Sequence, residues 1–238
     1  KRLGVSECQS SYTEFDASDI GQAHLGHIIE NRLIQLSLWQ RLQQHSNITL
    51  LCPESLIKLE QHATEVELTL TSKKLRSKIV IGADGANSYV RKLANIGTTG
   101  TIWLAGVFVS DGMPKGDTLR RRHANQYHKG RVLLLGDAAH TINPMAGQGV
   151  NLGFKDVKAL QHVIAQAIGN GESWQQADVL ARYQQKRRTD NLLMMTAMDA
   201  LYLSFGHVSP LVKLARNAGL TMVNKLPKLK NKALAYAI

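Results

Sequence analysis

The chain has 238 residues, of which 44% are hydrophobic and 20% charged, with 29 Lys and Arg against 18 Asp and Glu. This composition is ordinary for a globular protein and excludes collagen-like, mucin-like and disordered chains. The net charge of +11 indicates an anionic partner: nucleic acid, a membrane surface or a phosphate-bearing cofactor. No uncharged apolar run approaches the roughly 18–20 residues that span a bilayer.

The first half of the chain predicts strands around one amphipathic helix. Alternation of polar and apolar residues over 11–15 indicates a strand near the start. Apolar residues at three- and four-residue steps predict a helix over 28–41. Short apolar runs then predict strands over 48–51, 56–59, 66–70 and 78–81, and a short helix follows over 89–94.

The second half of the chain is mostly helical. One more compact apolar strand is predicted over 131–135. Beyond residue 149 the periodicity predicts helices over 151–169, 174–203, 210–223 and 228–237. Strands followed by a long helical region indicate an α/β protein with a helical C-terminal region.

Two glycine-aspartate turns each follow a compact apolar strand. The first reads Gly-Ala-Asp-Gly and contains Asp84, and the second reads Gly-Asp-Ala-Ala-His and contains Asp137. Ligands of open α/β sheets bind at the carboxyl ends of strands, where both aspartates are expected. Gly147 and Gly149 open the next predicted helix, whose free N–H groups favour a negatively charged oxygen. We therefore expect a cofactor site at these turns, with two ordinary strand-ending turns as the alternative.

Together the two turns resemble the "DG" and "GD" motifs of the group A flavin-dependent aromatic hydroxylases. The segment 141–153, reading TINPMAGQGVNLG, is most similar to the branch that acts in ubiquinone biosynthesis. The resemblance implies a FAD/NAD(P)-binding Rossmann-like fold of the para-hydroxybenzoate hydroxylase type. It also implies FAD as cofactor, NAD(P)H as reductant, and a polyprenylated quinol or phenol as the ring that O2 hydroxylates.

The resemblance also assigns roles to individual residues. Asp137 would bind the ribityl chain, and Asp84 would act nearer the pyrophosphate. Gly147 belongs to the glycine turn, and the backbone N–H groups of Gly149, Val150 and Asn151 would lie near the N1–C2=O edge of the flavin. Pro144, the one residue assigned to catalysis, would shape the loop at the flavin face where oxygen reacts. No metal site is expected.

Two other side chains near these motifs carry open alternatives. Arg91 is either a secondary site residue or a solvated charge on a helix. His140 is a candidate general base, because histidine often has this role. A ring that bears a hydroxyl is already activated, however, so a structural hydrogen bond is the preferred interpretation of His140.

The chain also departs from the family pattern. The Gly-x-Gly-x-x-Gly turn that holds the FAD pyrophosphate does not occur, and only 53 positions separate Asp84 from Asp137. We therefore expect an incomplete fold, from a processed or partly ordered chain. Residues 1–96 and 121–170 would form a partial FAD-binding domain, 97–120 a remnant of the substrate-binding segment, and 171–238 the helical C-terminal region.

Positive charge is concentrated at the C-terminal end. Residues 205–238 contain six Lys and Arg and no Asp or Glu, interleaved with apolar residues. Such a surface suits anionic lipid headgroups, with packing on the protein's own core as the alternative. We expect a cytoplasmic bacterial protein, peripheral to the inner membrane, with other ubiquinone-biosynthesis proteins as partners and no nucleic acid. The competing functions are a sibling phenol hydroxylase, a scaffold that has lost FAD, and another FAD enzyme such as a geranylgeranyl reductase or halogenase.

Overall fold

The computed structural model describes residues 2–8, 11–103, 119–142, 149–206, 209–228 and 230–231. Pro144 and Gly147 lie outside these residues, as does most of the predicted helix 228–237. Contacts between residues divide the chain into two compact units. One unit consists of Lys1–Pro53 with Leu203–Ile238, and the other of Glu54–Tyr202. The domain bounds expected from the sequence differ from these units and remain a prediction.

The first unit contains a hairpin and two helices. Strands β1 (Arg2–Cys8) and β2 (Ser11–Asp16) pair antiparallel, which confirms the predicted N-terminal strand. A short 3-10 helix, η1 (Ala17–Ile20), follows, and α1 (Asn31–Gln43) confirms the first predicted helix with a later start. Helix α5 (Pro210–Lys225) has its proline in the first turn, where no N–H is needed, and it packs against β2.

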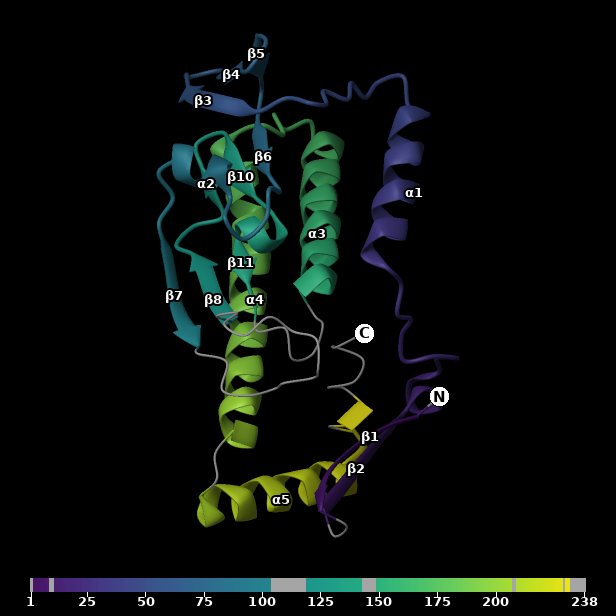
Figure 1. The fold of residues 1–238 in the computed structure, drawn as a ribbon. Coiled ribbons are helices and arrows are strands. Elements are labelled where there is room, and N and C mark those ends of the chain that lie inside the picture. The colour runs from purple at the N-terminus through teal and green to yellow at the C-terminus, as the bar shows by residue number, and fades with distance from the viewer. Residues whose placement is uncertain are drawn as a thin grey trace. The chain divides into compact units, whose positions relative to one another are not determined.

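In its described residues, the second unit contains three small sheets and three helices (Figure 1). One sheet is the antiparallel meander of β3 (Leu56–Gln61), β4 (Val66–Leu70) and β5 (Lys74–Ser77). Another places β10 (Val132–Leu134) between β6 (Val80–Gly82) and β9 (His128–Lys129). The third places β8 (Leu119–Ala124) between β7 (Thr98–Trp103) and β11 (His140–Thr141). The helices are α2 (Tyr89–Leu93), α3 (Gly149–Gly169) and α4 (Ala177–Gly206).

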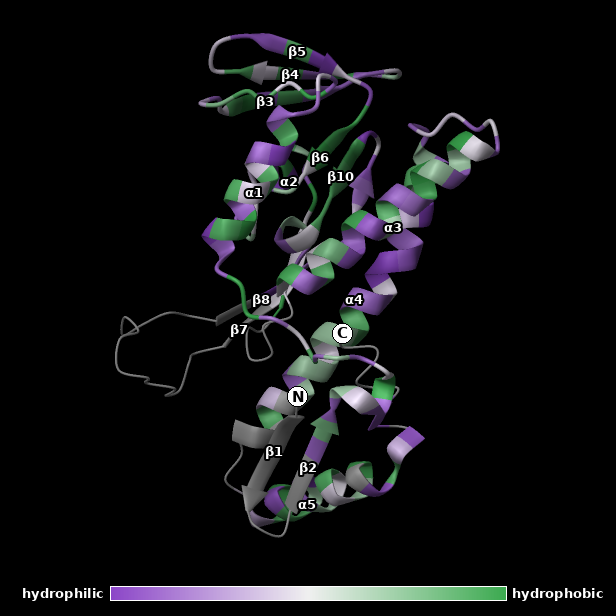
Figure 2. Ribbon diagram, turned by 90° about the vertical axis from the view of Figure 1, so that its right-hand side faces the viewer, coloured by the Kyte–Doolittle hydropathy of each residue, from purple (hydrophilic) through white to green (hydrophobic). Residues whose placement is uncertain are grey.

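The core of the second unit lies around β10. All three residues of this strand are fully buried, and α3 and α4 contribute Leu160, Val163, Leu180 and Tyr183. Figure 2 shows β6 and β10 as hydrophobic strands beside the mixed surfaces of the helices. A strand that is buried on both faces needs a continuous apolar run, which explains why 131–135 could be recognised in the sequence.

One predicted strand is wrong. Residues 48–51 form no strand in the structure, although three of the four are apolar. The run ends two residues before Pro53, which has no backbone N–H to donate, and Ile48 remains exposed. Strand β5 was not predicted, because its sequence, Lys-Leu-Arg-Ser, carries only one apolar residue.

Gly82, at the end of β6, is expected to tolerate no side chain. A Cβ atom there would lie 2.9 Å from both Cβ and Cγ1 of Val90 and 3.1 Å from Cδ2 of Leu134. We expect Gly82→Ala to lower the free energy of unfolding by about 1–3 kcal/mol through overpacking, measured by urea denaturation. Gly169→Ala is the control, because no atom lies within 4 Å of its added Cβ. Equal midpoints for the two variants would contradict this account of the packing.

Candidate functional site

The two glycine-aspartate turns emerge from neighbouring parallel strands. Strands β6 and β10 pair in parallel, with Gly82 opposite Leu134, and the N–H of Leu135 donates to the Gly82 carbonyl at 2.9 Å. Parallel strands end at the same edge of a sheet, so the turns that carry Asp84 and Asp137 begin side by side. This is the edge where ligands of open α/β sheets bind.

Arg91 ties the two turns together. Its side chain is buried, and its Nη1 donates to the Ala138 carbonyl at 2.7 Å while Nη2 donates to the Ala86 carbonyl at 2.9 Å. Ala138 belongs to the second turn and Ala86 to the first. The interpretation of Arg91 as a solvated helix charge is therefore wrong. Burial and the nearby guanidinium of Arg122 lower the pKa of Arg91 from its very high ordinary value.

Asp84 caps helix α2. One carboxylate oxygen accepts from the Ser88 hydroxyl at 2.5 Å, and the other accepts from the N–H groups of Tyr89 and Val90 at 2.7 and 3.0 Å. Burial alone would raise the pKa of Asp84, but these hydrogen bonds outweigh it and lower the pKa. Asp84 thus fixes the first turn, and the expected contact with the cofactor remains a prediction.

Asp137 is placed differently. It lies in η2 (Gly136–Ala138), is exposed, and its carboxylate accepts no hydrogen bond from any residue that the structure describes. Desolvation by the surrounding protein raises its pKa, an effect that His140 partly offsets. A carboxylate with free acceptor sites at the carboxyl end of a strand can bind the hydroxyl groups of a ligand.

The start of α3 approaches this turn closely. A Cβ atom on Gly149 would lie 3.9 Å from Oδ1 of Asp137, and one on Gly153 would lie 3.6 Å from the Cα of Gly136. Gly136 has a φ of +55°, in the left-handed region that favours glycine. The structure therefore places Asp137 close to the first turn of α3, which contains Gly149, Val150 and Asn151, at the positive end of a 21-residue helix; their contact with the cofactor remains a prediction.

A buried polar network beneath the second turn escaped the sequence analysis. Asp156 on α3 is fully buried, and its carboxylate accepts from Gly136 N–H at 3.1 Å, Arg187 Nε at 2.8 Å and Asn191 Nδ2 at 3.0 Å. Its Oδ2 lies 2.6 Å from Nε2 of His140. Burial would raise the pKa of Asp156, but these partners lower it. The signal was available, because Asp156 is the one acidic position on the apolar side of α3.

His140 belongs to this network, as the preferred structural interpretation requires. The ring is buried, and Asp156 holds one of its nitrogens. Such a ring is held in place by the protein and is not exposed to solvent. Among the described residues there is also no cluster of His, Cys, Asp and Glu that could hold a metal ion.

His123 is expected to make folding stability pH-dependent. It is buried, its Nε2 lies 3.0 Å from the Tyr127 hydroxyl, and burial together with nearby Arg188 lowers its pKa to about 4. The unfolded chain, with an ordinary pKa near 6.5, binds the proton first as pH falls. Stability is therefore complete above about pH 6.5 and declines toward pH 4, by about 2 kcal/mol at pH 5.

Urea midpoints measured between pH 7 and pH 5 check this expectation. His123→Gln should lose less stability over that range than the unsubstituted chain does. His162, exposed on α3, provides the matched control, and His162→Gln should behave like the unsubstituted chain. A pH dependence that survives in His123→Gln would show that another group causes it.

The donors and acceptors at the second turn fit a flavin cofactor. Asp137 offers acceptor sites that no described residue occupies, the first turn of α3 offers backbone N–H groups, and Gly136 and Gly153 approach each other without side chains. The exposed side chain of Val150 adds an apolar contact for a ring system. Pro144 and Gly147 lie outside the described residues, so their assigned roles remain predictions.

Comparisons with known proteins agree with this geometry. Residues 115–196 match a family model described as FAD binding domain. The p-nitrophenol 4-monooxygenase from Pseudomonas putida DLL-E4 shares the fold, with a TM-score of 0.76 over 95% of this chain and 76% of that chain, at 18% identity. The fold is therefore one that a solved monooxygenase shares, and the matched segment defines a FAD-binding protein.

Two curated relatives narrow this class. The 3-demethoxyubiquinol 3-hydroxylase of Escherichia coli (strain K12) is 35% identical over 100% of this chain and 79% of its own length. The mitochondrial ubiquinone biosynthesis monooxygenase COQ6 of Xenopus tropicalis is 40% identical over 49% of this chain and 25% of its own length. The chain belongs to the FAD-dependent hydroxylases of ubiquinone biosynthesis.

The alignment with the Escherichia coli relative also contains an internal difference in length. It spans 309 positions against the 238 residues of this chain, which leaves 71 positions without a counterpart here. The alignment covers the whole chain, so these positions fall between its aligned ends. The sequence predicts that these unmatched positions fall between Asp84 and Asp137, where the chain is shorter than the family pattern.

Proposed function

We propose that the protein hydroxylates the ring of a polyprenylated benzoquinol in ubiquinone biosynthesis, with FAD, NAD(P)H and O2. The observation that supports this most strongly is the 35% identity, over the full chain, to a protein named 3-demethoxyubiquinol 3-hydroxylase. The coarser part, a quinol or phenol substrate for a flavin hydroxylase, follows from the family.

Each residue of the site has a definite part in this proposal. Asp137 would accept hydrogen bonds from the ribityl hydroxyls, because its carboxylate has free acceptor sites. The N–H groups of Gly149, Val150 and Asn151 would stabilise negative charge at the N1–C2=O edge of the cofactor. Pro144 would shape the loop next to the ring, and Arg91 would hold the two turns in register. The bound flavin would supply the redox chemistry with oxygen that no protein side chain provides.

Oxygen incorporation tests the proposed reaction. The chain, supplied with FAD and NAD(P)H, is incubated under ¹⁸O2 with a short-chain prenylated benzoquinol, and the product is analysed by mass spectrometry. The expected product carries one ¹⁸O atom, in a hydroxyl group bonded to the ring. Incorporation into a prenylated phenol alone would favour the sibling phenol hydroxylase. A chain that neither retains flavin nor forms product would favour the scaffold that has lost FAD, which the 71 unmatched alignment positions also make a candidate.

A location at the inner membrane of a bacterium is part of the proposal. A polyprenylated ring is held in the bilayer by its apolar tail, so a protein that reaches it has to work at the surface. No helix in the described part of the chain is both long and apolar enough to cross a membrane. We propose peripheral attachment through the basic C-terminal region, together with other ubiquinone-biosynthesis proteins as partners.

A further inference from the structure

Helix α5 exposes a continuous apolar stripe. The exposed fractions are 78% for Leu211, 68% for Leu214, 63% for Met222 and 40% for Leu226. With the exposed Ala218, these positions recur every three or four residues and so lie on one face of the helix. Apolar side chains of this size are usually buried, so a stripe four turns long indicates a surface that contacts something else.

The opposite side of the helix is occupied by the unit itself. Val212, Leu220 and Val223 are partly buried on the side of α5 that packs against β2. Just beyond the helix, Lys230 is anchored to the same unit, with its Nζ 3.2 Å from Oδ2 of Asp19 and 3.0 Å from the Glu14 carbonyl oxygen. The unit therefore holds α5 by one face and presents the other.

Exposed positive charges lie on α5 and directly after it, outside the apolar stripe. Lys213, Lys225 and Lys228 are exposed, and no ion pair is found for them among the residues that the structure describes. The chain has no Asp or Glu between residues 205 and 238 that could neutralise them. Lys230, by contrast, is committed to Asp19, so the basic tail contributes fewer free charges than its sequence suggests.

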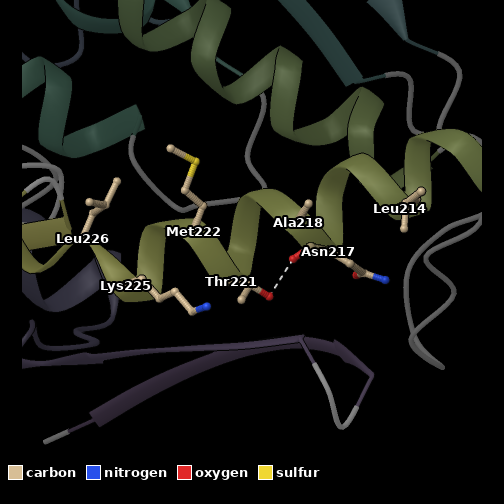
Figure 3. A pocket seen from close by; sticks show the side chains of 7 residues that line it. All are labelled: Leu214, Asn217, Ala218, Thr221, Met222, Lys225 and Leu226. Atoms are coloured by element: carbon tan, nitrogen blue, oxygen red, sulfur yellow. Dashed lines mark hydrogen bonds between the residues drawn. The ribbon is translucent and has the colours of Figure 1, made fainter.

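The close view of α5 shows how the two kinds of side chain are separated (Figure 3). Met222 and Leu226 point to one side of the helix, whereas Thr221 and Lys225 point to the other. The Thr221 hydroxyl donates to the Asn217 carbonyl at 2.9 Å, which satisfies that hydroxyl within the helix. These residues line a depression of about 610 Å³, and all of them lie on α5 or directly follow it.

We propose that α5 is the element that docks on an anionic lipid surface, with Leu211, Leu214 and Met222 inserted at the level of the headgroups and upper acyl chains. Lys213, Lys225 and Lys228 contact the headgroup phosphates. This inference deepens the peripheral attachment proposed above and rests on that proposed function. It assigns the membrane contact to one face of α5, whereas the proposal above assigned it to the whole basic C-terminal region.

Charge and shape favour a lipid surface over other occupants. The helix combines an exposed apolar stripe with exposed lysines outside it, and helices that lie in the membrane interface have this composition. At 16 residues α5 is about 24 Å long, too short to span the bilayer but long enough to lie in its plane. The exposed lysines would repel a second copy of the same helix.

Vesicle flotation with the full chain tests the proposal. The probe vesicles contain equal parts of phosphatidylglycerol and phosphatidylcholine, and vesicles of pure phosphatidylcholine serve as reference. Replacing Lys213, Lys225 and Lys228 together with Gln should weaken binding about 100-fold, because each lysine near an anionic surface contributes a factor of about five. The matched control replaces Lys73, Lys78 and Lys92, three exposed lysines of the second unit, with Gln.

The apolar half of the contact has its own pair of variants. Leu211→Gln with Leu214→Gln should weaken binding at least 10-fold even at high salt, where the charges are screened. Leu33→Gln with Leu36→Gln on α1, whose side chains are about half exposed, should leave binding unchanged. The circular dichroism spectrum of each variant confirms that α5 has remained folded.

Several outcomes would overturn the proposal. Binding that is unchanged in both α5 variants, or lost equally in the control variants, would place the contact elsewhere. A chain that ignores the vesicles but sediments as a dimer dispersed by the α5 variants would show that a second copy covers the stripe. The flavin content of each sample keeps this test separate from the proposed function, since lost vesicle binding with intact flavin concerns α5 alone.

Discussion

Asp137→Ala is expected to abolish the retention of FAD while the chain keeps its fold. The carboxylate is exposed and accepts no hydrogen bond within the described residues, so its removal breaks no hydrogen bond among them. Toward a bound flavin, the same carboxylate would make charge-assisted hydrogen bonds, each contributing about 1.5–3 kcal/mol. Losing them weakens binding about 10- to 100-fold or more.

The ratio of flavin to protein after desalting measures this effect, and a thermal melt of the same sample reports the fold. Asp178→Ala is the matched control, because Asp178 is an exposed carboxylate in the first turn of α4. That variant should retain flavin as the unsubstituted chain does. Retention of stoichiometric flavin by Asp137→Ala would remove Asp137 from the cofactor site.

Asp156→Ala, in contrast to Asp137→Ala, is expected to lower the free energy of unfolding strongly. The substitution removes the one fully buried carboxylate that pairs with Arg187 among the described residues, and it deprives His140, Asn191 and Gly136 N–H of an acceptor. Breaking a buried pair in this way costs about 3–5 kcal/mol. A typical domain has only about 5–15 kcal/mol of stability in total, so much of the fold's margin would be lost.

The neighbouring Asp190 provides the comparison for this prediction. It also pairs with Arg187, at 3.2 Å, but its side chain is 50% exposed. An exposed pair contributes about 0–1 kcal/mol, so Asp190→Ala should change the urea midpoint only slightly. If both variants shifted the midpoint equally, Asp156 would not be the centre of the network that holds the second turn.

The sequence predicted the parts of the site that depend on local pattern. The runs that form β6 and β10 are short, continuous and apolar. The glycines and aspartates that follow them can be identified directly in the sequence. The first turn of α3 could be placed for the same reason. Parallel pairing of the two strands was implied only by the family resemblance, because nothing local encodes which strands become neighbours.

The parts that were missed depend on contacts between distant residues. Asp156 meets His140, Arg187 and Asn191 across separations of 16, 31 and 35 positions, and no single window of sequence contains such a set. The contacts of Arg91 also depend on residues that are distant from one another in the sequence. On a helix of five residues it had the pattern of a solvated charge, yet two carbonyl groups from separate turns surround its guanidinium.

The most direct test of the proposed cofactor site is hydrogen exchange of the full chain with and without FAD. The account predicts that FAD slows amide exchange at two places, residues 136–139 and residues 149–152, where the turn and the first N–H groups of α3 would contact the cofactor. Protection confined to other segments, with exchange at these two places unchanged, would contradict the placement of the flavin at the second glycine-aspartate turn.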